Sequence, residues 1–180
     1  VSQTHGYNDT PEEWTRLIRE LAPLWYKVAK EQAHLYVCCD IDGFHFAREQ
    51  LAAAGWWVHR TPLINYKPDG SRVPWPEHGP QRKWELVLYA VKGKRPVTRI
   101  YPDVIETKGD PNLGHGAQKP VELYLNLLKR SVRPGDSVLD CFGGTGTVVV
   151  AAHELKCKAT YIELDPVYYG IALKRVEGLK

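Results

Sequence analysis

A glycine-rich turn late in the chain has the composition of a nucleoside-binding loop. The stretch DCFGGTGT occupies residues 140–147, and its three glycines let a ligand approach the backbone with no Cβ in the way. A helix expected after the turn would present free N–H groups to negative charge. Glu163 ends the next expected strand, where an acid typically accepts hydrogen bonds from a ribose. The pattern fits any nucleoside-bearing cofactor, including a dinucleotide, and the alternative is that the glycines serve only a tight turn.

An alternation of helices and strands must position this turn. Thr10, Pro11 and Glu13 predict a helix start, because they combine a capping hydroxyl, a proline at the first helical position and an acid that can complete the cap. Asp42 is expected to cap a second helix. We expect strands at 35–39, 56–66, 84–91, 137–141 and 159–164, and helices over 119–132, over 148–155 and from 165 onward. The apolar run at 35–39 predicts a strand covered on both faces. This order predicts an α/β fold with an open, doubly wound, mostly parallel sheet.

The composition is that of one globular domain. The 180 residues are 43% hydrophobic and 25% charged, which argues against disorder or a repeat array. No apolar run approaches the roughly 20 residues that span a bilayer, and no leader pattern opens the chain, so we expect a cytoplasmic protein with no membrane partner. The four cysteines lack CxxC spacing, which predicts no metal site and no disulfide, and we expect them reduced and mostly buried. The chain begins at Val1 and contains no Met, which predicts a piece of a longer product or a sequence with residues missing.

Basic residues gather in the middle of the chain. The net charge is +3, and residues 66–108 hold nine Lys and Arg against five acids. A basic central segment in an otherwise balanced domain is typical of a protein that binds a nucleic-acid phosphate backbone. The alternative is a solvated loop with ordinary Lys and Arg residues. Arg72, Trp75, Arg82 and Lys83 interleave charge with an aromatic ring, which predicts contact with double-stranded DNA. The alternative for Trp75, between two prolines, is that it packs the loop down.

Three motifs in order resemble one enzyme family. HGAQKP at 115–120, DCFGGTGT at 140–147 and YIELD at 161–165 together resemble the amino-methylating DNA methyltransferases of the permuted, beta-type order, in which the cofactor half follows the catalytic half. The likeness continues more weakly upstream, through CDIDGFHFAREQLAAAGWWVHRTPLINYKPDG and WELVLYAVKGK. It implies a Rossmann-like fold that binds S-adenosylmethionine without a metal. The cofactor-binding positions it implies are His115, Lys119, Pro120, Asp140, Phe142, Gly144, Gly146, Thr147, Glu163 and Asp165.

The resemblance also gives some of these residues roles. Thr147 is expected to cap the helix after the turn, Lys119 to lie near the methionine end of the cofactor, and Glu163 to hold the ribose. Asp165 would lie near the adenine side. For His115 an ordinary loop histidine is the alternative.

The segment Asp165-Pro166-Val167-Tyr168 is one residue away from the family's catalytic D-P-P-Y. Its order along the chain makes it the turn after the second cofactor strand, and no D-P-P-Y precedes the first helix. The resemblance therefore implies a single domain that is incomplete at its N-terminus. Its parts are a catalytic-side half at 1–92 without the catalytic loop, a short recognition or linker segment at 93–114, and a cofactor-binding half at 115–180.

Two classes of function remain open. The first is a DNA amino-methyltransferase whose catalytic strand lies outside this sequence, with adenine N6 favoured over cytosine N4 by the family's preference. The second is a catalytically incomplete subunit that binds cofactor or DNA, as a homodimer or with a partner chain. A dinucleotide-dependent oxidoreductase would leave HGAQKP unexplained. We expect the chain alone not to methylate DNA, and its short segment at 93–114 to give modest sequence specificity at best.

Overall fold

The computed structural model describes residues 10–69, 77, 80–111 and 113–179. Helices and strands alternate along most of this length. In chain order they are α1 (Pro11–Val28), β1 (Ala33–Cys39), α2 (Ile41–Ala53), β2 (Trp57–Val58), β3 (Leu63–Tyr66), β4 (Trp84–Lys92), β5 (Val104–Glu106), α3 (Val121–Lys129), β6 (Ser137–Asp140), α4 (Thr147–Glu154), β7 (Lys158–Tyr161) and α5 (Pro166–Glu177). The α/β class predicted from the alternation is confirmed.

The described strands form two sheets. The larger has the order β1-β4-β3-β5, with β2 also paired to β4, and the smaller consists of β6 and β7. Pairings to β4 are antiparallel, whereas β3 with β5 and β6 with β7 are parallel. Among the described strands of the larger sheet, only β4 is therefore antiparallel to the rest. This arrangement agrees with the predicted mostly parallel sheet. The expected single open sheet is divided between β1 and β6.

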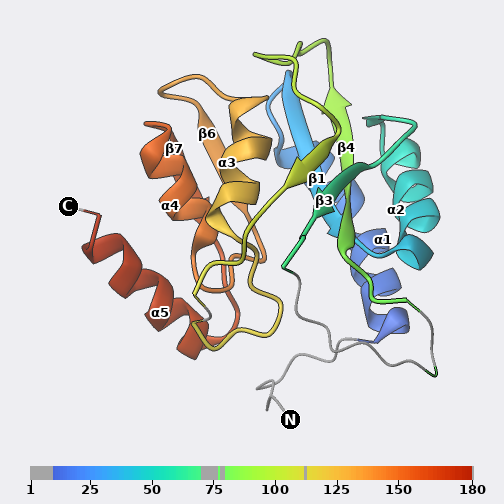
Figure 1. The fold of residues 1–180 in the computed structure, drawn as a ribbon. Helices are drawn as coiled ribbons and strands as arrows, with labels where there is room; N and C mark the ends of the chain where they lie inside the picture. The colour runs from blue at the N-terminus through green and yellow to red at the C-terminus, as the bar shows by residue number, and fades with distance from the viewer. Residues whose placement is uncertain (1–9, 70–76, 78–79, 112, 180) are drawn as a thin grey trace.

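Apolar side chains cover both faces of the larger sheet. On one face α1 and α2 pack against β4 through a core that includes Ala22, Leu51 and Leu88. On the other face Leu123 of α3 packs with Val87 of β4. Figure 1 shows β6 and β7 with α4 and α5 on one side of the molecule, the larger sheet with α1 and α2 on the other, and α3 between them.

Local signals placed the start of the first helix correctly but chose the wrong cap for the second. The Thr10 hydroxyl accepts a hydrogen bond from the Glu13 N–H at 3.2 Å, and Pro11 opens α1 as predicted. The second helix is capped by Asp40, whose carboxylate accepts the Gly43 N–H at 2.8 Å, so the prediction of Asp42 as the cap was wrong. Asp40 is the cap because it directly follows the end of β1 at Cys39 and still has the extended conformation of an N-cap residue.

Two expectations about burial were also wrong. No residue of β1 is fully buried, and Cys38 is exposed to solvent, although its apolar sequence predicted cover on both faces. The cysteines are free, as predicted, but none is fully buried, because Cys39, Cys141 and Cys157 are half-buried. Among the described residues no helix combines the length and apolar character needed to cross a membrane.

Candidate cofactor site at the glycine turn

Gly143, Gly144 and Gly146 form the link between β6 and α4 because each meets a different steric demand. Gly144 and Gly146 have φ values of +53° and +79°, in the left-handed region that residues with a Cβ rarely adopt. A Cβ on Gly143 would collide with the ring of Tyr161, and one on Gly146 would lie 2.8 Å from the Cβ of Ala172. The glycines at 143 and 146 therefore allow β7 and α5 to approach the turn closely.

Glu163 ties the turn to the end of the neighbouring strand. Its Oε2 accepts the Gly144 N–H at 2.7 Å, and its Oε1 accepts the Asp165 N–H at 2.8 Å. The Tyr161 hydroxyl donates to the Gly144 carbonyl oxygen at 2.6 Å. Two main-chain segments that are far apart in sequence are thus held by one carboxylate and one phenol.

Asp140 organises the first residues of the turn. Its Oδ1 accepts the Phe142 N–H at 3.0 Å, and its Oδ2 accepts the Tyr124 hydroxyl at 3.1 Å. Burial raises the pKa of Asp140 despite these two hydrogen bonds, and burial also raises the pKa of Tyr124. The Phe142 side chain is 52% exposed. Its ring is therefore available at the surface of the turn.

The segment before α3 lies against the glycine turn. The His115 ring lies 4.3 Å, centroid to centroid, from the ring of Tyr168, and it is the nearest group to the space where Gly144 lacks a Cβ. Pro120 occupies the N-cap position of α3 without a side-chain cap, and the Lys119 carbonyl accepts the Thr147 hydroxyl at 3.2 Å. The structure thus brings the three motifs of the sequence together at one place.

One residue has a role that differs from the expected one, and a second has a capping role in addition to its expected place near the adenine side. Gly146, not Thr147, is the N-cap of α4, so the predicted capping role of Thr147 was wrong; its hydroxyl binds the Lys119 carbonyl instead. The Asp165 carboxylate caps α5 by accepting the Val167 N–H at 2.7 Å.

An ion-pair cluster beside the turn was missed by sequence reasoning. Glu85 of β4 binds Lys67 with a 2.6 Å pair and lies 3.6 Å from the Lys119 ammonium. Burial alone would raise the pKa of Glu85, but the Lys119 and Lys67 ammonium groups lower it. No local pattern marks such a cluster, because its members come from three separate segments.

The expected DNA-binding residues are only partly described. Arg72 and Trp75 lie outside the described residues. Arg82 is exposed, whereas Lys83 donates from its Nζ to the Pro68 carbonyl at 2.9 Å. Arg82 and Lys83 lie directly before β4, close in sequence to Glu85.

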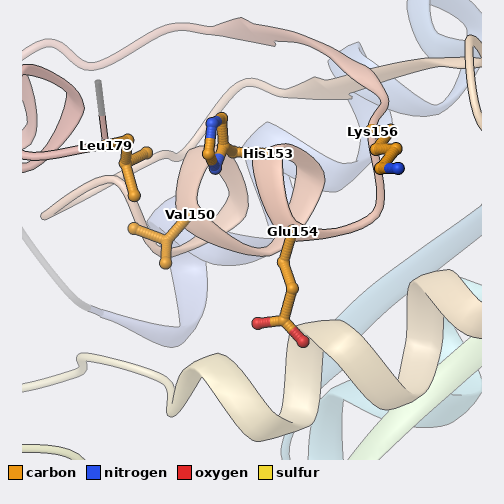
Figure 2. A pocket seen from close by; sticks show the side chains of 5 residues that line it. All are labelled: Val150, His153, Glu154, Lys156 and Leu179. Carbon is orange, nitrogen blue, oxygen red and sulfur yellow. The ribbon is translucent and has the colours of Figure 1, made fainter.

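A hollow lies toward the C-terminal end of α4. Its lining consists of Val150, His153, Glu154, Lys156 and Leu179 (Figure 2). The glycine turn lies before the N-terminus of α4, whereas the residues that line the hollow come from the middle of α4 onward. The hollow is therefore separate from the candidate cofactor site. The part of the chain that the structure describes contains no cluster of His, Cys, Asp and Glu suited to a metal ion.

Curated relatives match parts of this chain. The type II methyltransferase M.Cfr9I of Citrobacter freundii is 42% identical over 64 residues, which are 36% of this chain and 21% of that protein. Ribosomal protein L11 methyltransferase of Chloroflexus aurantiacus is 29% identical over 143 residues, 72% of this chain and 42% of that protein. The chain therefore spans about a fifth of M.Cfr9I and under half of the second relative.

Solved structures match nearly the whole fold. The complex of M1.HpyAVI with SAM has a TM-score of 0.80 at 22% identity, covering 93% of this chain and 85% of that one. The cytosine-N4-specific PvuII DNA methyltransferase has a TM-score of 0.75 at 16% identity, covering 97% and 75%. A family model described as DNA methylase matches residues 2–174. Given this match over almost its full length, the chain belongs to the N6/N4 DNA methylase family.

Proposed function

We propose that this chain binds S-adenosylmethionine at the glycine turn and serves methyl transfer to an exocyclic amine of a DNA base. The observation that carries the proposal is the turn itself, which Glu163 ties to the segment after β7 and beside which the His115 ring and the exposed Phe142 ring lie. The similar protein M1.HpyAVI was solved in complex with SAM, which supports the choice of cofactor.

The residues present fit such a cofactor. Each oxygen of Glu163 accepts one main-chain N–H, and each keeps a lone pair for a ribose hydroxyl. Gly144 has no Cβ, and the His115 ring is the nearest described side chain, 3.5 Å from where a Cβ would stand. The exposed Phe142 ring offers an apolar surface beside the turn. The site therefore combines an acceptor for hydroxyls, an open backbone and a ring for a base or methylene chain.

The cofactor supplies a methyl group already activated on a sulfonium, so the reaction needs alignment and charge stabilisation rather than a metal. In our proposal Glu163 fixes the ribose, Gly144 and Gly146 let the backbone come close, and Asp140 holds the turn in shape. Lys119, paired to Glu85, would face the methionine end. These groups bind and orient, and none of them accepts a proton from the target amine.

The acceptors for that amine are proposed to lie outside these 180 residues. No D-P-P-Y occurs in the sequence, and the Asp165 carboxylate is engaged in capping α5. We favour adenine N6 over cytosine N4 as the target. A subunit that binds cofactor or DNA without catalysing is the alternative candidate.

We expect the bare chain to leave DNA unmethylated. Incubation with methyl-labelled cofactor and mixed duplex DNA should give incorporation at the background level of a reaction without protein, while calorimetry of the same sample shows cofactor binding. Incorporation above background would contradict the proposal. Asp165→Asn, which keeps a capping side chain, would then show whether Asp165-Pro166-Val167-Tyr168 is catalytic.

A basic loop between β3 and β4 is proposed to follow the DNA backbone. Replacing Arg72 and Lys83 with Ala should flatten the dependence of duplex affinity on salt, by about one unit of slope for each phosphate that the variant no longer binds. The matched control replaces Lys30 and Lys158 with Ala. Both lysines are exposed near the starts of β1 and β7, and this variant should leave the salt dependence of duplex affinity unchanged. Equal slopes in both double variants and the parent chain would assign the loop residues to solvent.

A further inference from the structure

Glu85 lies at the edge of the larger sheet where its parallel strands end. It is the second residue of β4 and stands opposite Asn65, near the end of β3. Because β4 is antiparallel to β1 and β3, the start of β4 lies beside the carboxyl ends of both strands. Glu85 shares a face of β4 with Val87, two residues along, and Leu123 of α3 packs on that face. The Glu85 side chain therefore lies under α3, at the edge where open α/β sheets bind their ligands.

The two carboxylate oxygens of Glu85 have different surroundings. Oε1 pairs with the Lys67 Nζ at 2.6 Å, whereas Oε2 is buried and receives no hydrogen bond from any described residue. The Lys119 Nζ lies 3.6 Å from Oε2, which is longer than a hydrogen bond. The opposite residue, Asn65, has its Oδ1 bound by the Thr107 hydroxyl and makes no bond to Oε2. Buried acceptors are normally paired, so Oε2 is an acceptor that a bound group can use.

Glu85 and Lys119 present opposite charges side by side. Burial opposes ionisation of Glu85, but the Lys119 and Lys67 ammonium groups hold its pKa below the usual value, so it is an anion at neutral pH. Lys67 is held closely by Oε1, whereas Lys119 is held less tightly, at the longer distance. Oε2 and the Lys119 Nζ therefore form a pair that can receive one cationic and one anionic group.

This pair lies next to the candidate cofactor site. After burial, the groups that act most strongly on the pKa of the Cys38 thiol are Lys119, Glu85 and Asp140, so all three lie around that thiol. Asp140 organises the first residues of the glycine turn. The Lys119 carbonyl accepts the Thr147 hydroxyl at 3.2 Å, which holds the main chain of Lys119 against the start of α4. A ligand at the turn can therefore reach both members of the pair.

The methionine end of S-adenosylmethionine is a zwitterion, with an ammonium and a carboxylate group on one carbon. In the proposed function Lys119 faces this end, and a lysine ammonium group can bind only the carboxylate. The ammonium group needs an acceptor, and a charged acceptor gives the stronger hydrogen bond. We propose that Glu85 is a cofactor-binding residue whose Oε2 accepts a hydrogen bond from that ammonium group. The inference rests on the proposed function, because it requires the cofactor to lie at the glycine turn.

Two ligands separate the ammonium contact from the rest of the cofactor. S-adenosylhomocysteine has the same amino-acid end as S-adenosylmethionine, and in its deamino analogue a hydrogen atom replaces the α-amino group. By calorimetry at neutral pH, the full chain should bind S-adenosylhomocysteine at least about tenfold more tightly than the analogue, because the analogue cannot make the charged hydrogen bond. Equal affinities for the two ligands would overturn the proposal without any substitution.

Glu85→Gln should remove most of this discrimination. The variant keeps the size of the side chain and loses its charge, so the affinity for S-adenosylhomocysteine should fall by about tenfold while that for the analogue stays nearly unchanged. The control Lys67→Met removes the partner of Oε1 but keeps the carboxylate, and it should preserve the discrimination. Equal weakening of both ligands by Glu85→Gln, or loss of discrimination in Lys67→Met as well, would mean that Glu85 only holds the lysines in place.

Failure of the proposed function would give a different result. Glu163→Ala should weaken the two ligands alike, because both carry the ribose. A chain that binds neither ligand would contradict the proposed function. Binding of both ligands with equal affinity would contradict only the role of Glu85.

Discussion

Replacing Glu163 with Ala should lower the affinity for S-adenosylmethionine by about 10- to 100-fold. The change removes the proposed acceptor for the ribose hydroxyls, and it leaves the Gly144 and Asp165 N–H groups without their partner. A polar group left unpaired on partial burial costs about 1–3 kcal/mol, and each 1.4 kcal/mol is a tenfold change in affinity. Isothermal calorimetry with the cofactor measures the effect directly.

The control for Glu163 removes an equivalent charge elsewhere. Glu154 is exposed on α4, away from the glycine turn, so Glu154→Ala should bind the cofactor as the parent chain does. Glu163→Gln keeps one carbonyl acceptor but turns an NH2 group toward one of the two N–H donors, and it should fall between parent and Ala. Equal affinity for parent and Glu163→Ala would refute the ribose assignment, and tighter binding of NAD would refute the choice of cofactor.

Gly143→Ala should destabilise the fold and weaken cofactor binding together. The added methyl group collides with the ring of Tyr161, whose hydroxyl holds the Gly144 carbonyl, so the turn and β7 must separate. Overpacking of this kind costs about 1–3 kcal/mol of unfolding free energy. Urea denaturation measures the stability, and calorimetry measures the affinity.

A double-mutant cycle separates the collision from other effects. If the Tyr161 ring is the obstacle, Gly143→Ala should cost much less in a chain that already carries Tyr161→Ala, because the space is then free. Gly144→Ala is a second comparison, since its Cβ would have the His115 ring no nearer than 3.5 Å and the main cost is its left-handed φ. Additive costs in the cycle would show that the ring does not restrict Gly143.

Local signals made much of the fold predictable. Thr10 and Pro11 determine the start of α1 within one turn, so their spacing was sufficient. The second helix shows the limit, because Asp40 and Asp42 are both capping residues and the choice depends on where β1 ends. Apolar runs likewise identified β1 and β6 as strands but carried no information about their neighbours. The division into two sheets depends on partners that are not encoded in either run.

In the candidate site, too, local motifs were predictable from the sequence and contacts between distant residues were not. The glycine turn and Glu163 were recognised from motif spacing, and the structure places them in contact. Tyr161 and Glu85 were missed, because each acts through a partner 17 or more residues away and has an ordinary neighbourhood in the sequence. Thr147 was misassigned because a glycine in the left-handed conformation can end a turn without a capping side chain.

The unpaired edge of β1 in the described structure also affects how separate molecules of this chain would associate. Natural edge strands are usually protected by charged residues or proline, which discourage pairing with other molecules. The segment AHLYVCC has neither, and among the described strands it pairs only with β4, so the N–H and C=O groups of its other edge form a template for strands from neighbouring chains. A strand paired with this edge would cover that template and prevent edge-to-edge association of separate molecules.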